Sequence, residues 1–565
     1  MIIDSYELPD GEVLQADVCI VGAGAAGITM ALEFLRSGID VLLLESGGYG
    51  EEAATQALYE GSVADARLHS PPDRYRQRRF GGTTTIWGGR CMPFDAIDFE
   101  PREYVPHSGW PITLRDLAPY YVRANRICEA GEFAYSVEEA FHRPVRALID
   151  GYESDQFSTN TLERFSCPTD FGARYAHRLR SAPNVRTVLH ANVTHLHADA
   201  AGRSVERAGV TNLRGARFTV RARQFVLAAG GLEIPRLLLA SGVDGGPGLG
   251  NAHDVVGRYY MCHLAGTMGA IRIDKPASAV WHSYEISDEG IYCRRRFALR
   301  QAAQRSQGIA NFVARLHHPR ITDPAHGSPV LSLLMLARGF IPYEYRIRLT
   351  GAGRTDLRTW AAHARNVALG SLDAGKFAWH MLRDRKLAER KFPSIIIRSK
   401  ANMFSLDFHA EQQPNPQSRI SLTAARDVLG MPRLNVDWRY TPGDVDTVRR
   451  SIALLAEDFR RQRIGSFDYD PADVEAEMTR YGAYGGHHIG TTRMGTDPRT
   501  SVVNADCRVH DLDNLFIAGS ATFPTSSQAN PTLTIVALAL RLSAHLKRLM
   551  SRAPAEPSET QGMAP

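Results

Sequence analysis

The stretch DVCIVGAGAAG, residues 17–27, decides the fold of this 565-residue chain. Residues 17–21 form a short apolar run that ends in glycines, which is typical of a buried parallel strand. Residues 25–36 have helical character, and Gly38 stands where such a helix should stop. A second buried strand is expected at 41–44, closed by Glu45. Strand, turn, helix and strand within about thirty residues make a βαβ unit, so the sequence predicts an α/β fold.

The glycines of this stretch occupy the positions that a bound dinucleotide requires. Gly22 allows a tight turn, Gly24 lets the backbone approach a pyrophosphate, and Gly27 permits close packing of helix against strand. The helix that begins near Ala25 would direct its N–H groups and the positive end of its dipole at the phosphates. Glu45 is placed to accept hydrogen bonds from a ribose diol. We therefore predict a dinucleotide site, which this motif alone does not assign to FAD or NAD.

Two later segments also end strand signals on glycine. Strand patterning from Val185 to Val226 leads into FVLAAGG at 225–231, and NLFIAG at 514–519 precedes an apolar helix expected at 532–550. Because these pieces are far apart in the chain, we predict a Rossmann-like domain that is assembled discontinuously. This FAD- or NAD-binding domain is expected to comprise residues 15–110, 185–262 and 480–550. Residues 111–184 and 263–479 are expected to form a second, substrate-binding domain with an antiparallel sheet and helices. Residues 551–565 are expected to be a disordered tail.

Composition and charge argue against several classes of protein. The net charge of +5 is small for this length and gives no indication of a nucleic-acid partner. Seven scattered cysteines without a CxxC pair argue against a structural zinc site and a disulfide framework, so no metal is predicted. No apolar run of about 18 residues predicts a membrane span. The acidic start MIIDSYELPDGE carries no basic leader or twin-Arg signal, so we expect a cytoplasmic location, with export alongside a partner subunit left open.

Three further segments bear on the cofactor. They read FGGTTTIWGGRCMP at 80–93, YGGHHIGTTRMGTDP at 484–498 and NLFIAGSATFPTSSQANPTLTIVALAL at 514–540. With the glycine turn, they make the chain resemble the glucose–methanol–choline (GMC) oxidoreductases, which are FAD-dependent, from residue 17 to about 548. The C-terminal pair looks most like the pyranose oxidase and glucoside dehydrogenase branch. The resemblance implies bound FAD, and oxidation of an alcohol, in that branch a sugar or glycoside hydroxyl.

The resemblance also implies a catalytic pair. The family's H-x-x-G-T motif fits His487-x-x-Gly490-Thr491, and the later Asn fits Asn530 before Pro531. A neutral imidazole suits removal of a hydroxyl proton, because its ordinary pKa of about 6.5 lies near neutrality. Asn530 offers a donor and an acceptor that can hold the hydroxyl in line. The neighbouring His488 does not fit the spacing, and we predict a packing or supporting role for it.

The motifs together predict which residues contact the flavin. The expected cofactor-binding set is Gly22, Gly24, Ala25, Ala26, Gly27, Glu45, Gly81, Gly82, Thr83, Thr84, Trp87, Gly88, Val193, Ala229, Gly519, Ser520, Pro531 and Thr532. Ile86 stands where pyranose oxidase has the histidine that tethers its flavin covalently, so noncovalent FAD is expected. Gly88 stands where that enzyme has a threonine near flavin N5. The electron acceptor, whether oxygen, a quinone or a cytochrome subunit, is left open.

Other residues and other functions are also candidates. His263 and the pair Glu411 and Gln412 resemble the family's substrate-facing strands, and each is equally consistent with a structural polar group. Residues 331–391 carry 12 Lys or Arg against 5 Asp or Glu with amphipathic helical patterning. They predict a solvated helical insertion or, as the alternative, a face for a partner subunit or an anionic lipid surface. An FAD-dependent monooxygenase would normally need a second nucleotide motif, which is absent from the sequence, and a non-catalytic flavin-binding subunit would not need His487 and Asn530.

Overall fold

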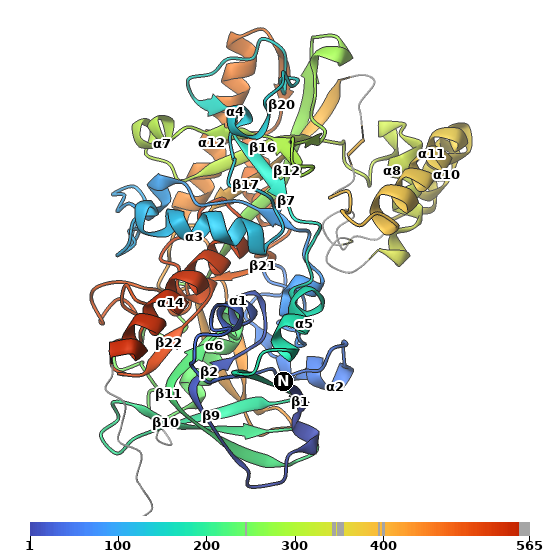
Figure 1. The fold of residues 1–565 in the computed structure, drawn as a ribbon. Coiled ribbons are helices and arrows are strands. Elements are labelled where there is room, and N and C mark those ends of the chain that lie inside the picture. The colour runs from blue at the N-terminus through green and yellow to red at the C-terminus, as the bar shows by residue number, and fades with distance from the viewer. Residues whose placement is uncertain (243–245, 342–345, 347–354, 394–395, 398–401, 553–565) are drawn as a thin grey trace, which may run out of the picture.

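The computed structural model describes residues 1–242, 246–341, 346, 355–393, 396–397 and 402–552. Two sheets lie at opposite ends of the molecule, each with its own hydrophobic core (Figure 1). The first is mostly parallel and carries the N-terminal strands, whereas the second is antiparallel. This arrangement confirms the predicted α/β fold with a mostly parallel nucleotide-binding sheet and an antiparallel sheet beside it.

The first sheet is built around the strand that ends in the glycine turn. β2 pairs in parallel with β3 on one side and with β11 on the other, and β22 extends the parallel part beside β11. β10 and β9 continue from β11 as an antiparallel meander. The strands span Ile2–Asp4 (β1), Val13–Val21 (β2), Val41–Leu44 (β3), Val185–Leu189 (β8), Asn192–Ala198 (β9), Val205–Thr211 (β10), Arg217–Leu227 (β11) and Leu515–Ile517 (β22). All three separated pieces of chain therefore meet in one sheet, as predicted.

Helices from five parts of the chain cover this sheet. α14 packs against both α1 and α3, and α5 packs against α1 (Figure 1). The helices span Ala25–Glu33 (α1), Leu114–Ile127 (α3), Phe171–Arg180 (α5), Gly230–Ala240 (α6) and Thr532–Arg552 (α14). α1 is shorter than the predicted 25–36 because the chain turns at Arg36, whose φ is 59°. The expected helix at 532–550 is confirmed.

The second sheet has β12 at its centre. β12 pairs with β17, β20 and β21, and the order continues from β17 through β16 and β15 to β6. The strands span Phe157–Ser158 (β6), Met261–Ile273 (β12), Phe297–Leu299 (β15), Phe312–His317 (β16), Met403–Glu411 (β17), Gly465–Asp468 (β20) and Tyr484–Ile489 (β21). Buried side chains of α12 (Pro442–Arg461) and α13 (Val474–Thr479) belong to the same core.

Two small sheets and three short helices accompany the two large sheets. One sheet joins β5 (Arg90–Cys91), β7 (Leu162–Phe165), β14 (Tyr292–Arg295) and β13 (Glu285–Ile286). The other joins β4 (Ser62–Val63), β19 (Pro432–Asp437) and β18 (Arg419–Arg426). The short helices are α2 (Ala53–Gln56), α4 (Val137–Ala140) and α7 (Gln301–Gln307). Because β5 pairs with β7, the end of the loop at 80–93 lies within the first of these small sheets.

The packing differs from the predicted division of the chain at two places. α3 and α5 lie in the range 111–184, predicted for the substrate domain, yet both pack into the core of the first sheet. Tyr121 of α3 shows why, because its hydroxyl lies 2.8 Å from the Thr534 hydroxyl of α14. β21 lies in the range 480–550, predicted for the flavin domain, yet it pairs with β12 of the second sheet. The histidine motif therefore lies where the part of the chain around the first sheet meets the part around the second sheet.

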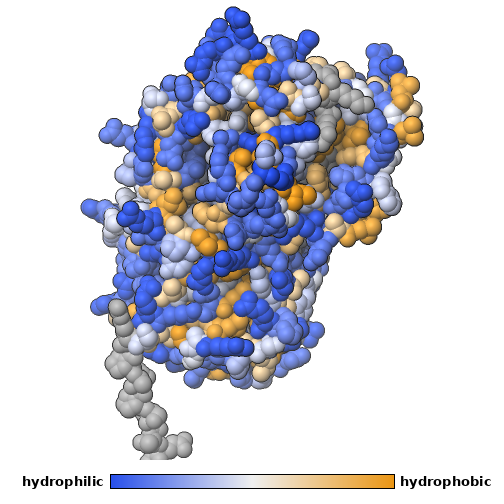
Figure 2. All heavy atoms as spheres, turned by 45° about the horizontal axis from the view of Figure 1, so that its top comes forward, coloured by the Kyte–Doolittle hydropathy of each residue, from blue (hydrophilic) through white to orange (hydrophobic). Residues whose placement is uncertain are grey.

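A helical lobe projects from the side of the molecule (Figure 1). It contains α8 (Pro329–Leu336), α10 (Leu357–Leu369) and α11 (Ser371–Met381), and α10 and α11 both pack against α8. Leu372 and Trp379, seven residues apart on one face of α11, are 81% and 61% exposed. Figure 2 shows hydrophobic side chains interleaved with hydrophilic ones on this side. Within the described residues, no helix is both long and apolar enough to cross a membrane.

Candidate active site

The glycine turn after β2 is built as the sequence requires. Gly22 has a φ of 106°, and a Cβ there would lie 2.8 Å from the Ala228 carbonyl oxygen. A Cβ on Gly27 would lie 1.8 Å from the carbonyl oxygen of Gly22, so only glycine lets α1 approach β2 this closely. A Cβ on Gly24 would meet nothing within 4 Å. The third glycine therefore serves packing, whereas Gly24 leaves space open in front of the helix N-terminus.

Glu45 stands at the end of β3 beside this turn. Its carboxylate accepts hydrogen bonds from the backbone N–H groups of Ala23, at 2.7 Å, and Gly47, at 3.1 Å. Burial raises the pKa of Glu45, and these backbone donors oppose the shift. Two carboxylate oxygens can accept about four hydrogen bonds in total. The residue can therefore hold the turn in shape and still accept from a ribose hydroxyl.

A cavity runs from Glu45 past the glycine turn to the start of α14. Predicted cofactor-binding residues that line it are Gly22, Gly24, Ala25, Ala26, Glu45, Gly82, Thr83, Thr84, Trp87, Val193, Ala229, Gly519, Ser520 and Thr532. Gly27, Gly81, Gly88 and Pro531 do not line it. Gly81 instead donates its N–H to the Ala23 carbonyl at 2.9 Å, which holds the loop at 80–93 against the glycine turn. The sequence motifs thus converge on one elongated space.

Residues that the motifs did not indicate also line this cavity. Arg78 and Tyr59 lie near its Glu45 end, with the Arg78 guanidinium 4.8 Å from the centre of the Tyr59 ring. Glu233 of α6 binds both Arg78, at 3.1 Å, and Arg76, at 3.0 Å. The sequence feature that could have indicated Arg78 is its position two residues before the FGG of the 80–93 loop. The contribution of Tyr59 could not be read from any local pattern.

His487 and Asn530 meet at the seam between the two halves. His487 lies on β21 and Asn530 lies just before α14, and both are half-buried. The Asn530 Nδ2–H group donates to His487 Nε2 at 3.2 Å. On the other side of the ring, His487 Nδ1 lies 2.7 Å from Nδ1 of His263 on β12. The structure thus brings the two predicted catalytic residues together and adds His263 to them.

Burial lowers the pKa of His487 well below its ordinary value. The neighbouring His263 and the Arg90 guanidinium add to this effect, because a positive charge on the ring is unfavourable beside them. His487 is therefore neutral around neutral pH, and a neutral imidazole carries one lone pair that can accept a proton.

His488 points away from this pair, because successive residues of a strand face opposite sides. Its Nδ1 lies 2.6 Å from the Tyr260 hydroxyl, which also lies 2.8 Å from His69 Nε2 and 3.2 Å from Cys262 Sγ. His69, Cys262 and His488 each offer one atom that could bind a metal ion, and these three atoms lie within 4.8 Å of one another. The tyrosine hydroxyl between them accounts for the cluster as a hydrogen-bonded group.

Comparisons with known proteins identify the chain. A family model described as FAD dependent oxidoreductase matches residues 17–302, and one described as GMC oxidoreductase matches 414–539. The chain belongs to the GMC oxidoreductase family. It is an FAD-dependent enzyme that acts on CH–OH groups, which confirms the predicted family, cofactor and enzyme class.

Similar proteins cover nearly the whole length of this GMC oxidoreductase. The fructose dehydrogenase large subunit of Gluconobacter japonicus is 26% identical over 94% of this chain and 97% of its own. The 6'''-hydroxyparomomycin C oxidase of Streptomyces lividus is 25% identical over 93% of this chain and 90% of its own. A solved fungal aryl-alcohol oxidase has a TM-score of 0.56 at 13% identity, over 96% of this chain and 100% of its own. The last likeness shows the fold alone.

The cavity of this GMC oxidoreductase fits a dinucleotide. Gly22 and Gly24 of the glycine turn line it, and the open space at Gly24 is where a side chain would obstruct a pyrophosphate. The N-terminus of α1, at Ala25, faces the same space and would favour the phosphate charge. Thr532, the first residue of α14, lines the cavity as well. The helix dipole there favours negative charge.

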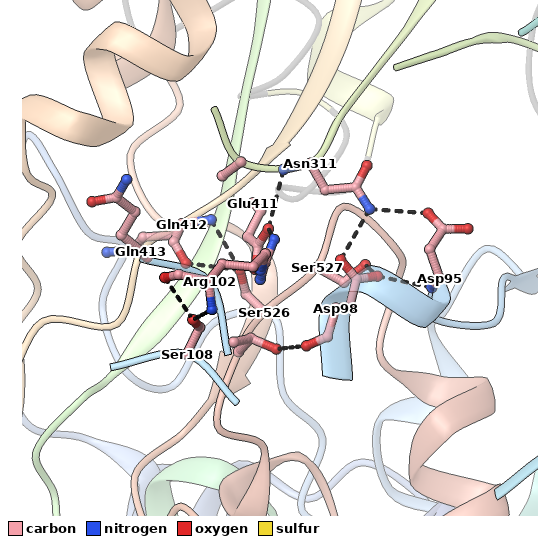
Figure 3. Close-up of polar contacts among 12 residues, drawn as sticks. Asp95, Asp98, Arg102, Ser108, Asn311, Glu411, Gln412, Gln413, Ser526 and Ser527 are labelled. Atoms are coloured by element: carbon pink, nitrogen blue, oxygen red, sulfur yellow. Dashed lines mark hydrogen bonds and ion pairs between the residues drawn. The ribbon is translucent and has the colours of Figure 1, made fainter. Parts of the chain in front are cut away.

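A buried polar network fixes the segment that leads to Asn530 (Figure 3). Asp98 accepts from the Ser527 hydroxyl at 2.6 Å and from the Asn311 amide at 3.0 Å. The Gln412 N–H donates to the Ser526 hydroxyl at 2.9 Å. Burial, with Glu411 and Asp95 nearby, raises the pKa of Asp98 to about 8. Segment 525–530 is therefore tied to both halves of the enzyme.

Glu411 and Gln412 have structural partners in this network. Glu411 forms a bidentate pair with Arg102, at 2.6 and 2.8 Å, and both side chains are buried. The Gln412 side-chain oxygen accepts from the Cys262 N–H at 2.8 Å and from the Trp438 indole at 2.9 Å. The sequence left open whether Glu411 and Gln412 face the substrate or are structural polar groups. Their contacts show structural polar groups with hydrogen-bond partners.

Proposed function

We propose that this enzyme oxidises a hydroxyl of a sugar or glycoside to a carbonyl, with His487 as the catalytic base and Asn530 as its partner. The contact of 3.2 Å between Asn530 Nδ2 and His487 Nε2 carries the proposal. The names of the relatives support the substrate class, because fructose dehydrogenase and hydroxyparomomycin oxidase are named for sugar and aminoglycoside substrates.

A substrate hydroxyl that takes the place of this direct contact would satisfy both side chains. Its O–H would donate to His487 Nε2, and its oxygen would accept from the Asn530 N–H. FAD held along the cavity by the glycine turn and the start of α14 would supply the two-electron acceptor for the hydride of the carbinol carbon. In the proposed step, His487 removes the hydroxyl proton while Asn530 holds the oxygen in line, so the carbonyl forms without a charged alkoxide left in a buried site.

Anaerobic reduction of the bound flavin separates this function from its alternatives. We expect a panel of sugars, glycosides and simple alcohols to include compounds that bleach the flavin absorbance, and NADPH to leave it unchanged. Bleaching by NADPH alone would favour a monooxygenase. A flavin that only dithionite reduces, against a broad panel, would favour a non-catalytic subunit.

We expect the FAD to be released without covalent attachment. Ile86, at the position of the histidine that tethers the flavin in pyranose oxidase, has an aliphatic side chain that forms no bond to the flavin ring. Precipitation with acid should leave all yellow colour in the supernatant, measured by absorbance at neutral pH. Colour retained on the washed pellet would contradict this prediction.

We expect faster turnover with a dye or quinone than with oxygen. Gly88 is exposed and puts no side chain where the oxygen-using relative has a threonine near flavin N5. Steady-state rates with dichlorophenolindophenol and with air-saturated buffer should differ by at least about tenfold, or about 1.4 kcal/mol of barrier. Equal or faster turnover with oxygen would show that the enzyme is an oxidase.

The helical lobe is proposed to contact an anionic lipid surface. Exposed Arg358 and Arg365 of α10 and Lys376 of α11 lie on the same two helices as exposed apolar residues such as Leu372 and Trp379. Apolar side chains that are bordered by bases suit the boundary between acyl chains and acidic headgroups. The alternative, docking on a partner subunit, would leave binding to pure lipid undetectable.

Reversing these three bases to glutamate should abolish co-sedimentation with phosphatidylglycerol vesicles, because each basic residue contributes about 1 kcal/mol near such a surface. Flavin content and dye reduction should stay unchanged. Reversal of Arg115, Arg178 and Arg449, which are exposed on α3, α5 and α12, alters net charge equally and serves as the control. Equal loss in both triple variants, or no binding by the parent enzyme, would contradict the proposal.

A further inference from the structure

His263 stands directly behind the catalytic histidine. It lies on β12, between β17 and β21, and its side chain is fully buried. Its Nδ1 lies 2.7 Å from His487 Nδ1, and its Nε2 lies 3.2 Å from the carbonyl oxygen of Ser526. We propose that His263 is a positioning residue that fixes the proton-accepting tautomer of His487, an inference that rests on the proposed function.

The chain of hydrogen bonds determines where each proton lies. A carbonyl oxygen only accepts, so Nε2 of His263 must carry a hydrogen and donate it to Ser526. In a neutral imidazole the other nitrogen is then an acceptor, which makes Nδ1 of His263 the acceptor of the 2.7 Å contact. His487 must therefore donate through its own Nδ1–H.

The same logic leaves the lone pair of His487 at Nε2. This nitrogen faces the Asn530 amide, whose N–H group donates to it. In the other tautomer, with the proton on Nε2 of His487, two N–H groups would face each other at Asn530. The two unprotonated Nδ1 atoms of His487 and His263 would also face each other. His263 thus directs the basic nitrogen of His487 to the place where we propose the substrate hydroxyl binds.

The surroundings of His263 keep it neutral, as this role requires. Burial lowers the pKa of His263 to about 4, although the Ser526 and Ala529 carbonyls and Glu411, its cross-strand neighbour on β17, favour the charged form. Arg90 opposes the charged form. The His409 ring lies 6.3 Å away on the same strand as Glu411. His263 therefore acts as an acceptor over the whole neutral range.

Two substitutions separate hydrogen bonding from packing. His263→Asn places an amide oxygen near the position of Nδ1 and can still accept from His487 Nδ1–H. His263→Leu fills similar space but accepts nothing, so either tautomer of His487 becomes available. We expect the leucine variant to reduce flavin about 10²-fold more slowly under anaerobic conditions, and the asparagine variant to stay within about tenfold of the parent.

The pH profile and the ring nitrogens provide readouts that a packing role would not move. A neutral His263 accepts from His487 Nδ1–H and leucine accepts nothing, so the acid limb of flavin reduction should move in His263→Leu and stay in place in His263→Asn. Nitrogen-15 spectra of histidine-labelled enzyme should show protonated Nδ1 and bare Nε2 for His487 in the parent and in His263→Asn. In His263→Leu they should show a mixture. The His487 signals are those missing from His487→Ala.

His69→Leu is the matched control, because it removes a buried histidine that contacts Tyr260 instead of His487. It should keep the parent pH profile. Equal losses in the asparagine and leucine variants, or a parent-like rate and pH profile in His263→Leu, would overturn the role of His263 alone. Parent-like flavin reduction by His487→Ala would instead overturn the proposed function.

Discussion

Replacing His487 with alanine should leave FAD bound and the fold intact while flavin reduction by substrate falls by ~10²–10⁴-fold, because the variant has no group at the position of Nε2 to take the proton. This loss corresponds to about 3–5 kcal/mol of barrier. Asn530→Ala should lose less, since the base remains and only its partner is removed. The measurement is anaerobic stopped-flow reduction at saturating substrate, after flavin occupancy has been checked.

His488→Ala is the control for this series, because its side chain faces Tyr260 on the other side of the strand. We expect a far smaller change in rate. In the parent, the rate should stay on a plateau as pH falls past the ordinary histidine pKa, and be lost only at more acid pH, since the lowered pKa keeps His487 neutral. An inactive His488→Ala with an active His487→Ala would place the base one residue later. Normal reduction by both would rule out a histidine base.

Gly24→Val should yield folded protein that is largely free of FAD. A Cβ at Gly24 meets nothing within 4 Å, and its φ of −84° suits any residue, so the substitution does not disturb the chain itself. The new side chain would occupy the space where the pyrophosphate approaches the backbone. Flavin per protein, measured by absorbance after purification, should fall to a small fraction of the parent value.

Gly375→Val tests whether any added side chain has this effect. Gly375 also has nothing within 4 Å of its Cβ position, but it lies on α11 in the lobe. Its flavin content should match the parent. Gly27→Val should instead fail to fold, because its Cβ would lie 1.8 Å from the Gly22 carbonyl oxygen. Full flavin content in Gly24→Val would contradict the proposed path of the pyrophosphate.

The strand–turn–helix at 17–44 could be predicted from a local pattern, because it depends on neighbours a few positions away in the chain. His487 and Asn530 were predicted from the resemblance to a family, and the structure places their side chains in contact. The contact between His263 and His487 depends instead on the pairing of β12 with β21, more than two hundred residues apart, which no local pattern contains. The prediction that α3 belongs to the substrate-binding domain was wrong for the same reason. An amphipathic helix shows that it has a buried face, but its sequence does not say which core receives that face.

The discontinuous first sheet has a consequence for how the enzyme is made. β22 is the parallel neighbour of β11, and α14 covers α1 with buried side chains such as Leu533, Val536 and Leu540. During synthesis, the N-terminal strands leave the ribosome first but gain these partners last, whereas the strands of the second sheet are all available by residue 489. Long-range contacts of this kind form slowly and leave apolar surface exposed meanwhile. FAD should therefore enter only after translation ends, and truncation before residue 515 should give an insoluble apoprotein.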